Sequence, residues 1–143
     1  MNYEPERDLE MRFPHVQVEL ADLSPALAAV IPGESLILFS RELTPTQRRT
    51  SLAHEIAHLD LHHSPTPLQW FSRRQEAEAD TLAVRRLITV AALADLVGWC
   101  ATDAELAQQL QVSVHAVRLR RTTLSQAESA IVEARIACVE YAA

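Results

Sequence analysis

The residues best suited to chemistry lie in one short segment, His54–His58, whose sequence is HEIAH. Two histidines at positions i and i+4 of a helix project from one face, close enough to hold one metal ion through their imidazole nitrogens. Glu55 follows the first histidine, where its carboxylate can reach a water molecule at the metal without being a ligand itself. On a helical wheel Leu52, Ile56 and Leu59 form an apolar face, and both histidines lie on the opposite face. The pattern predicts a metal site on an amphipathic helix; the alternative is a pair of surface histidines.

A catalytic zinc site uses three protein ligands and keeps a fourth position open, so a third ligand is expected from a neighbouring helix. Glu76, Glu78 and Asp80 offer three carboxylates further along the chain. Ala83, Val84 and Leu87 form the apolar stripe of the helix expected here. Positions three or four residues earlier on the same stripe are Asp80 and then Glu76, so both carboxylates are expected beside the core, where an unpaired charge would be costly. We therefore predict Glu76 as the third ligand and Asp80 as the acceptor of an N–H from a ligating histidine. Glu78 is expected to form an exposed ion pair with Arg74. The alternative for Glu76 and Asp80 is a solvated helix face.

The segments before the histidine helix predict a small sheet. Residues 16–20 alternate apolar and polar side chains, as a half-buried strand does. Two apolar runs, 26–31 and 35–39, are separated by the sequence PGE at 32–34. This arrangement predicts a hairpin in which Gly33 supplies the positive φ of a tight turn. A short helix in the alanine-rich run 26–31 is the alternative.

Helical patterns dominate the other segments, although residues 1–14 are as compatible with an extended arm as with a short helix. A capping box at 44–47 opens the histidine helix, which is expected to end near His62, before a proline-rich stop. A loop is then expected to carry Trp70 and Phe71. Later helices are expected from a second capping box at 72–75 to about Ile88, around 90–99, from 102–105 onward and from 125–128 onward.

Composition excludes several classes of protein. The chain of 143 residues has two glycines, whereas average usage would give about ten. Glycine-rich loops for dinucleotides or for nucleoside triphosphates are therefore excluded, and no nucleotide partner is expected. The net charge of −6 argues against a protein that coats nucleic acid or an anionic membrane. Cys100 and Cys138 are too few for a cysteine-rich zinc module, and the start lacks a secretory pattern, so we expect a cytoplasmic protein.

The segment 103–121 has the pattern of a helix-turn-helix, with apolar residues on both helices. Ser113 is the expected N-cap of the second helix, and Gln111 stands where such a turn often has glycine. The residues expected to face the groove if this unit bound DNA are His115, Arg118, Arg120 and Arg121. The alternative is a small helical bundle that packs on the preceding part of the chain or docks a partner, and the negative net charge favours it.

Taken together, these residues resemble the ImmA/IrrE family of metallo-endopeptidases over about residues 30–125. The matching features are HEIAH with Leu59 and His62 after it, EAEAD at 76–80 with Leu87 after it, and the tail from Leu106 to Arg118. The first two motifs are shared by gluzincin-like zinc peptidases, and the tail points to this family. The resemblance implies an α+β fold, a mostly helical, zincin-like minimal metallopeptidase with a small N-terminal antiparallel sheet. We expect a zinc metallopeptidase domain at 1–100 and a helix-turn-helix-like helical subdomain at 101–143.

The activity that the resemblance implies is that of a zinc-dependent endopeptidase that cleaves a transcriptional repressor of a phage, a mobile element or a stress response. In this interpretation Zn²⁺ is held by His54, His58 and Glu76, and Glu55 moves a proton from water to the leaving amine. His62, with His63 beside it, is a candidate second donor to the oxyanion.

The partner expected from the resemblance is a separate DNA-binding repressor, because the chain is too short for a fused DNA-binding or sensor domain. Direct binding to DNA is the lesser expectation, and no membrane partner is expected. The alternatives are a DNA-binding regulator with a structural zinc site and a module that sequesters the repressor without cutting it.

Overall fold

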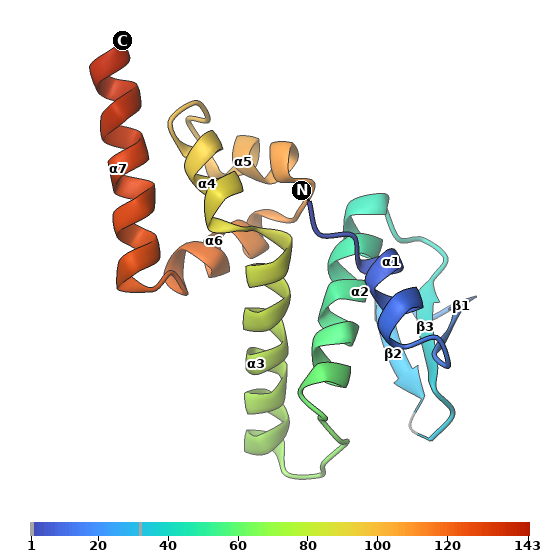
Figure 1. Ribbon diagram of the computed structural model, residues 1–143. Helices are drawn as coiled ribbons and strands as arrows, with labels where there is room; N and C mark the ends of the chain where they lie inside the picture. The colour runs from blue at the N-terminus through green and yellow to red at the C-terminus, as the bar shows by residue number, and fades with distance from the viewer. Residues whose placement is uncertain (1, 32) are drawn as a thin grey trace. The chain divides into compact units, whose positions relative to one another are not determined.

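The computed structural model describes residues 2–31 and 33–143 (Figure 1). The elements within these residues are α1 (Pro5–Arg12), β1 (Gln17–Ala21), β2 (Ala28–Ile31), β3 (Leu36–Ser40), α2 (Pro45–Asp60), α3 (Gln69–Leu87), α4 (Val90–Val97), α5 (Asp103–Leu110), α6 (Val114–Thr122) and α7 (Gln126–Ala142). A mostly helical chain with one small sheet confirms the expected α+β class. Among the described residues no helix combines the length and the apolar character needed to cross a membrane.

Two compact units divide the chain at a point inside α3, into Met1–Ala83 and Val84–Ala143. α4 packs against α5 and α7, so α4 and the end of α3 that leads into it belong with the C-terminal helices. The predicted domains, residues 1–100 and 101–143, stay a prediction. A compact unit is a region of dense packing, whereas a domain is a region that can fold independently.

The sheet of the first unit has the strand order β1-β3-β2 and is mixed, so the expectation of a wholly antiparallel sheet is wrong. β2 and β3 form the predicted antiparallel hairpin, and the alternative helix at 26–31 is excluded. Gly33 has a φ of 81°, as the turn requires, while Pro32 lies outside the described residues. β1 pairs with the other edge of β3 and runs parallel to it, because two chain reversals separate these strands.

The core of the first unit lies between β3 and the apolar face of α2. Ile37 and Phe39 of β3 pack with Leu52 and Ile56 of α2 and with Leu9 of α1, and all five are at most 5% exposed. The predicted capping box of α2 is present, with Thr44 and Gln47 satisfying each other's backbone N–H groups. Burial of one face of α2 leaves its opposite face, which carries His54 and His58, free to form a site.

The start of α3 differs from the prediction. The helix begins at Gln69, so Trp70 and Phe71 belong to its first turn and not to a loop, and the residues 72–75 lie inside the helix. The hydroxyl of Thr66 accepts the N–H of Leu68, and the carbonyl of Leu68 accepts the N–H of Ser72, 2.9 Å away. Because the helix has already begun at Gln69, the capping-box pattern at 72–75 does not mark its start.

Three helices of the second unit begin where the sequence pattern puts their starts, at Thr102, Ser113 and Ser125, each of which accepts a backbone N–H of the first turn that follows. Thr89, which was not predicted as a cap, does the same for α4. Gln111 adopts the left-handed conformation between α5 and α6, with a φ of 55°. The two helices and their connection therefore lie where the sequence pattern puts them, and their assignment as a helix-turn-helix stays a prediction. Both cysteines are free thiols.

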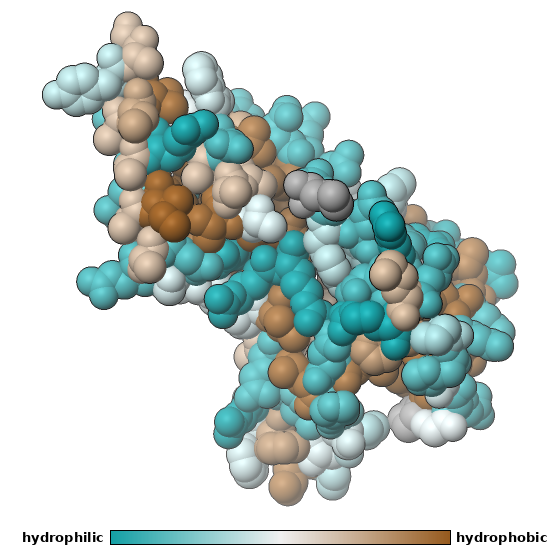
Figure 2. Space-filling view, viewed as in Figure 1, coloured by the Kyte–Doolittle hydropathy of each residue, from teal (hydrophilic) through white to brown (hydrophobic). Residues whose placement is uncertain are grey.

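Gly98 is explained by close packing and not by backbone conformation. Its φ of −77° is ordinary, but a Cβ at this position would lie 2.8 Å from Cγ2 of Val139 on α7. Hydrophobic side chains gather where α4 packs against α7 (Figure 2). Glycine therefore permits the two helices to approach at this point.

Gly98→Ala is expected to lower the free energy of unfolding by about 1–3 kcal/mol, because the added methyl group overpacks a contact with a stiff β-branched side chain. Val139→Ala in the same chain should remove most of this cost. A double-mutant cycle by chemical denaturation measures the coupling. Equal midpoints for Gly98→Ala and the unmodified protein would contradict the proposed close contact.

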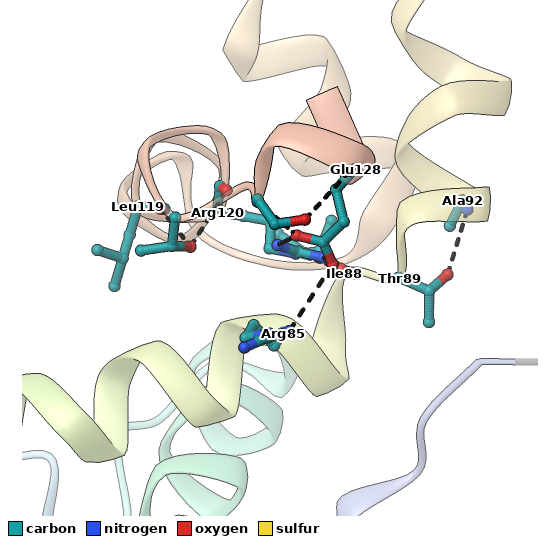
Figure 3. Close-up of polar contacts among 9 residues, drawn as sticks. Arg85, Ile88, Thr89, Ala92, Leu119, Arg120 and Glu128 are labelled. Carbon is teal, nitrogen blue, oxygen red and sulfur yellow. Dashed lines mark hydrogen bonds and ion pairs between the residues drawn. The ribbon is translucent and has the colours of Figure 1, made fainter. Parts of the chain in front are cut away.

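Arg120 is an internal structural residue, so its expected place facing a DNA groove is wrong. Its side chain is 2% exposed, and its guanidinium donates to the carbonyl oxygen of Ile88 over 2.8 Å and to Glu128 over 2.9 Å (Figure 3). Arg121 and Arg118 form ion pairs with Asp103 at 3.1 Å and 3.6 Å. Arg120 is therefore part of the interior of the unit, while the side chains of Arg118 and Arg121 stay 71% and 41% exposed.

Acid is expected to weaken the second unit through Glu128. Hydrogen bonds from Arg120 and from the backbone of Ser125 lower the pKa of Glu128 from 4.5 to about 2. Because the folded state depresses this pKa, the stabilisation is complete above pH about 4.5 and is lost as the pH falls toward about 2. Glu128→Gln should therefore be less stable near neutral pH and should have a flatter stability curve in that acidic range.

Denaturant unfolding at several pH values measures this effect, with Glu133→Gln as a control on the exposed side of the same helix. Parallel stability curves for Glu128→Gln and the unmodified protein would show that the loss of stability in acid does not come from Glu128.

Candidate metal centre

Two histidines of α2 and one carboxylate of α3 converge on a single point. The Nε2 atoms of His54 and His58 lie 2.9 Å apart. The carboxylate oxygens of Glu76 lie 3.2 Å from Nε2 of His54 and 3.3 Å from Nε2 of His58. These three side chains form the one group in the described part of the chain whose ligand atoms are arranged for a metal ion.

The spacing of these atoms fits a zinc ion. Ligand atoms about 2.0–2.1 Å from a tetrahedral zinc lie about 3.3 Å from one another, and two imidazoles with one carboxylate form a familiar catalytic ligand set. The Glu76 side chain is 57% exposed, and those of His54 and His58 are 21% and 18% exposed. The group is therefore open on one side, as a fourth coordination position requires.

Glu76 and Asp80 face the histidines as predicted, but the expectation that these two carboxylates lie along the buried stripe of α3 is wrong. The buried stripe of α3 consists of Ala79, Ala83, Val84 and Leu87, while the side chains of Glu76 and Asp80 are 57% and 47% exposed. The two carboxylates lie beside the stripe and face the histidines of α2. Their partners, and not burial in the core, account for their position.

Asp80 occupies the place predicted for it, 2.8 Å from Nδ1 of His54. A carboxylate accepts the Nδ1–H, which leaves the lone pair of Nε2 for a metal. Burial lowers the pKa of His54, but the hydrogen bond to Asp80 and the charges of Glu55, Asp80 and Glu76 outweigh it, so the pKa ends above its ordinary value. Protons therefore compete with a metal at this nitrogen more strongly in acid.

Glu55 is buried beside the ligand group, with 8% of its surface exposed. Burial raises the pKa of Glu55, and the charge of Glu76 raises it further, while His54 lowers it. A carboxylate whose pKa is raised by burial is better suited to take up a proton and release it again during one reaction. This environment suits a general base better than a structural ion pair.

A cavity of about 1090 Å³ connects the candidate ligands to the sheet. His54, Glu55, His58 and Glu76 line one side, and residues 27–31, which include β2, line another. Among the described residues β2 is an edge strand of the sheet, so one row of its backbone N–H and C=O groups faces no neighbouring strand there. The cavity therefore combines a polar centre with a backbone edge that can pair with an extended peptide.

The end of α2 brings a second pair of histidines to the site. His62 has a left-handed φ of 52° and lines the cavity, which keeps it a candidate donor to the oxyanion. His63 lies with its Nδ1 atom 2.8 Å from Nδ1 of His58 and its Nε2 atom 3.1 Å from Glu78. The contact of His63 with His58 was not predicted; its only signal in the sequence is a histidine three residues after the last residue of the helix.

Glu78 forms the expected ion pair with Arg74, at 2.9 Å, and it also accepts from His63. Hydrogen bonds from Arg74 and then from His63 lower the pKa of Glu78. The prediction of a pair with Arg74 is confirmed, but Glu78 is connected to the site through His63 and is not a separate surface residue.

Comparison with known proteins gives one family and a likeness to solved structures. The family model Peptidase_M78, described as IrrE N-terminal-like domain, matches residues 7–122. A solved structure described as a Mycobacterium tuberculosis transcriptional regulator has a TM-score of 0.69 and 17% sequence identity. The likeness covers 85% of this chain and 40% of that one, and at this identity it concerns the fold. No curated protein matches the chain.

Proposed function

The chain belongs to the Peptidase_M78 family, and on that premise we propose that it is a zinc-dependent endopeptidase that cleaves a separate DNA-binding repressor. The observation that carries the proposal is the convergence of His54, His58 and Glu76 within a few ångströms, beside the buried carboxylate of Glu55. An ion pair on a helix surface would not need two imidazoles whose Nε2 atoms lie 2.9 Å apart and face the same carboxylate.

The residues of the site divide the chemistry between them. His54, His58 and Glu76 would hold the zinc ion, which when bound makes water more acidic and polarises the scissile carbonyl. Glu55 accepts a proton from the attacking water and passes it to the nitrogen of the departing amine. Asp80 holds the imidazole of His54 in the tautomer that keeps Nε2 free. His62 is the proposed donor to the developing oxyanion.

The edge of β2 is the proposed binding surface for the substrate backbone. An extended peptide paired with this strand would lie along the cavity that contains Glu55 and Glu76. Leu27 and Val30, which are 46% and 40% exposed, would contact its side chains. Strand pairing recognises the backbone of any extended segment, which is the form in which peptide bonds are accessible to a protease.

Two observations support a repressor as the substrate. The net charge of −6 favours encounter with a basic partner, and DNA-binding proteins carry basic surfaces. The structural neighbour is described as a transcriptional regulator, which agrees with a role in the control of transcription. The chain spans 40% of the length of that neighbour, so the substrate is our proposal for this chain alone.

The proposal is tested with the purified protein and the helix-turn-helix repressor encoded nearest to its gene. Mass spectrometry of the mixture should show two fragments of the repressor in the presence of zinc and intact repressor after addition of a chelator. Intact repressor that forms a stable complex with the protein would instead support sequestration without cleavage. A salt-dependent complex of the protein with operator DNA would support the DNA-binding regulator.

A further inference from the structure

The two candidate ligand histidines are oriented in different ways. His54 contacts a carboxylate directly, with its Nδ1 atom 2.8 Å from Asp80. His58 contacts no carboxylate through Nδ1, which lies 2.8 Å from Nδ1 of His63. The other nitrogen of His63 lies 3.1 Å from Oε2 of Glu78, and Oε1 of Glu78 accepts from Nε of Arg74 over 2.9 Å. A chain of four side chains therefore ends on His58.

The positions of the hydrogen atoms in this chain follow from its end at Arg74. A guanidinium can only donate, and a carboxylate can only accept, so Glu78 accepts from both Arg74 and His63. His63 then carries its hydrogen on Nε2 and presents a lone pair at Nδ1. When His63 is neutral, His58 is the donor to that lone pair, which puts the hydrogen of His58 on Nδ1 and leaves Nε2 as an acceptor. This is the tautomer in which Nε2 of His58 points at Glu76 and His54 as a potential ligand.

We propose that His63 and Glu78 are positioning residues that hold His58 in its metal-binding tautomer and orientation. The proposal rests on the proposed function, in which Nε2 of His58 is a zinc ligand. His63 is suited to this role because its side chain is 8% exposed, so water competes little for either ring nitrogen. Glu78 is suited to it because both of its oxygens are held, one by Arg74 and one by His63.

His63→Leu is expected to weaken zinc binding by about 10–100-fold, which is the effect of losing a partner that orients a ligand. His63→Asn offers an amide oxygen in place of Nδ1 and should restore most of the affinity. Glu78→Gln should weaken binding several-fold, because its amide must turn a donor toward either Arg74 or His63. His15→Leu, which removes an exposed histidine outside the site, should bind zinc as the unmodified protein does.

The measurement is competition for Zn²⁺ with a chromophoric chelator, and circular dichroism shows that each variant is folded. Wild-type affinity in both His63→Leu and Glu78→Gln would overturn the proposal. If His63→Leu does not fold, His63→Asn and Glu78→Gln decide the matter, since only the second should lose affinity. Equal affinity of the two would count against the proposed chain of hydrogen bonds.

The tautomer of His58 separates this proposal from the proposed function. Nitrogen NMR of the metal-free protein at alkaline pH, where imidazoles are neutral, should show the Nδ1–H form for His58 and a mixture in His63→Leu. If the unmodified protein binds no zinc, the proposed function is contradicted. The NMR measurement of the His58 tautomer would still test whether His63 orients His58. The same mixture of tautomers in both proteins would contradict the role of His63.

Discussion

Glu55→Gln is expected to reduce cleavage of the repressor by about 10²–10⁴-fold while the zinc content of the protein stays unchanged. Glutamine has nearly the same size and shape as glutamate but cannot accept a proton from water. Because Glu55 is 8% exposed, bulk water is poorly placed to replace it as a base. Glu55 is also outside the converging ligand group, so its substitution should leave the metal in place.

The experiment compares fragment formation by the purified unmodified protein and Glu55→Gln, with metal content determined by mass spectrometry on the same samples. Glu133→Gln, which removes an exposed carboxylate of α7, is the matched control and should cleave normally. Cleavage by Glu55→Gln at the unmodified rate would show that another group is the base. Relief of repression by both proteins with the repressor intact would exclude proteolysis as the function.

His54→Ala is expected to reduce bound zinc to less than about a tenth of the unmodified level, and cleavage should be lost with it. Two remaining ligands cannot compete with a chelator as three can. Zinc binds the folded chain and so stabilises it, by about 2.7 kcal/mol when its free concentration is a hundred times the dissociation constant. A chelator should therefore lower the stability of the unmodified protein and leave that of His54→Ala almost unchanged.

Glu76→Ala tests the choice among the carboxylates of α3 and should lose zinc as His54→Ala does. Asp80→Asn, which keeps the side chain but weakens its hold on His54, should lower zinc affinity by about 10–100-fold. Zinc content and affinity are measured after dialysis, with Glu133→Gln as the control. A stoichiometric zinc ion in Glu76→Ala would remove Glu76 from the ligand set.

The parts of the fold that the sequence predicted well depend on neighbouring residues. The capping boxes of α2, α5 and α7 and the turn at Gly33 are short local arrangements whose hydrogen bonds are specified by residues three or four apart. The helical wheel of α2 likewise separated Leu52 and Ile56 from the histidines. Periodicity was sufficient there because one helix face must be buried.

The errors occur where a local pattern has more than one structural solution. The capping-box pattern at 72–75 lies inside α3 because the helix had already begun after Pro67. Arg120 looked like a surface residue, but Glu128 and the carbonyl of Ile88, both distant in the sequence, hold it in the interior. The direction of β1 depends on strand pairing, which an alternating pattern does not encode.

The sequence by itself determined the ligand-bearing face of α2, because the spacing of His54 and His58 matches the geometry of one helix. Periodicity also singled out Glu76 and Asp80, and the tertiary structure brings these two side chains of α3 to the histidines. The tertiary structure alone decided that His63 and Glu78 lie behind His58. Contacts between helices depend on how two buried faces pack, and that packing is a property of the whole unit and not of either segment.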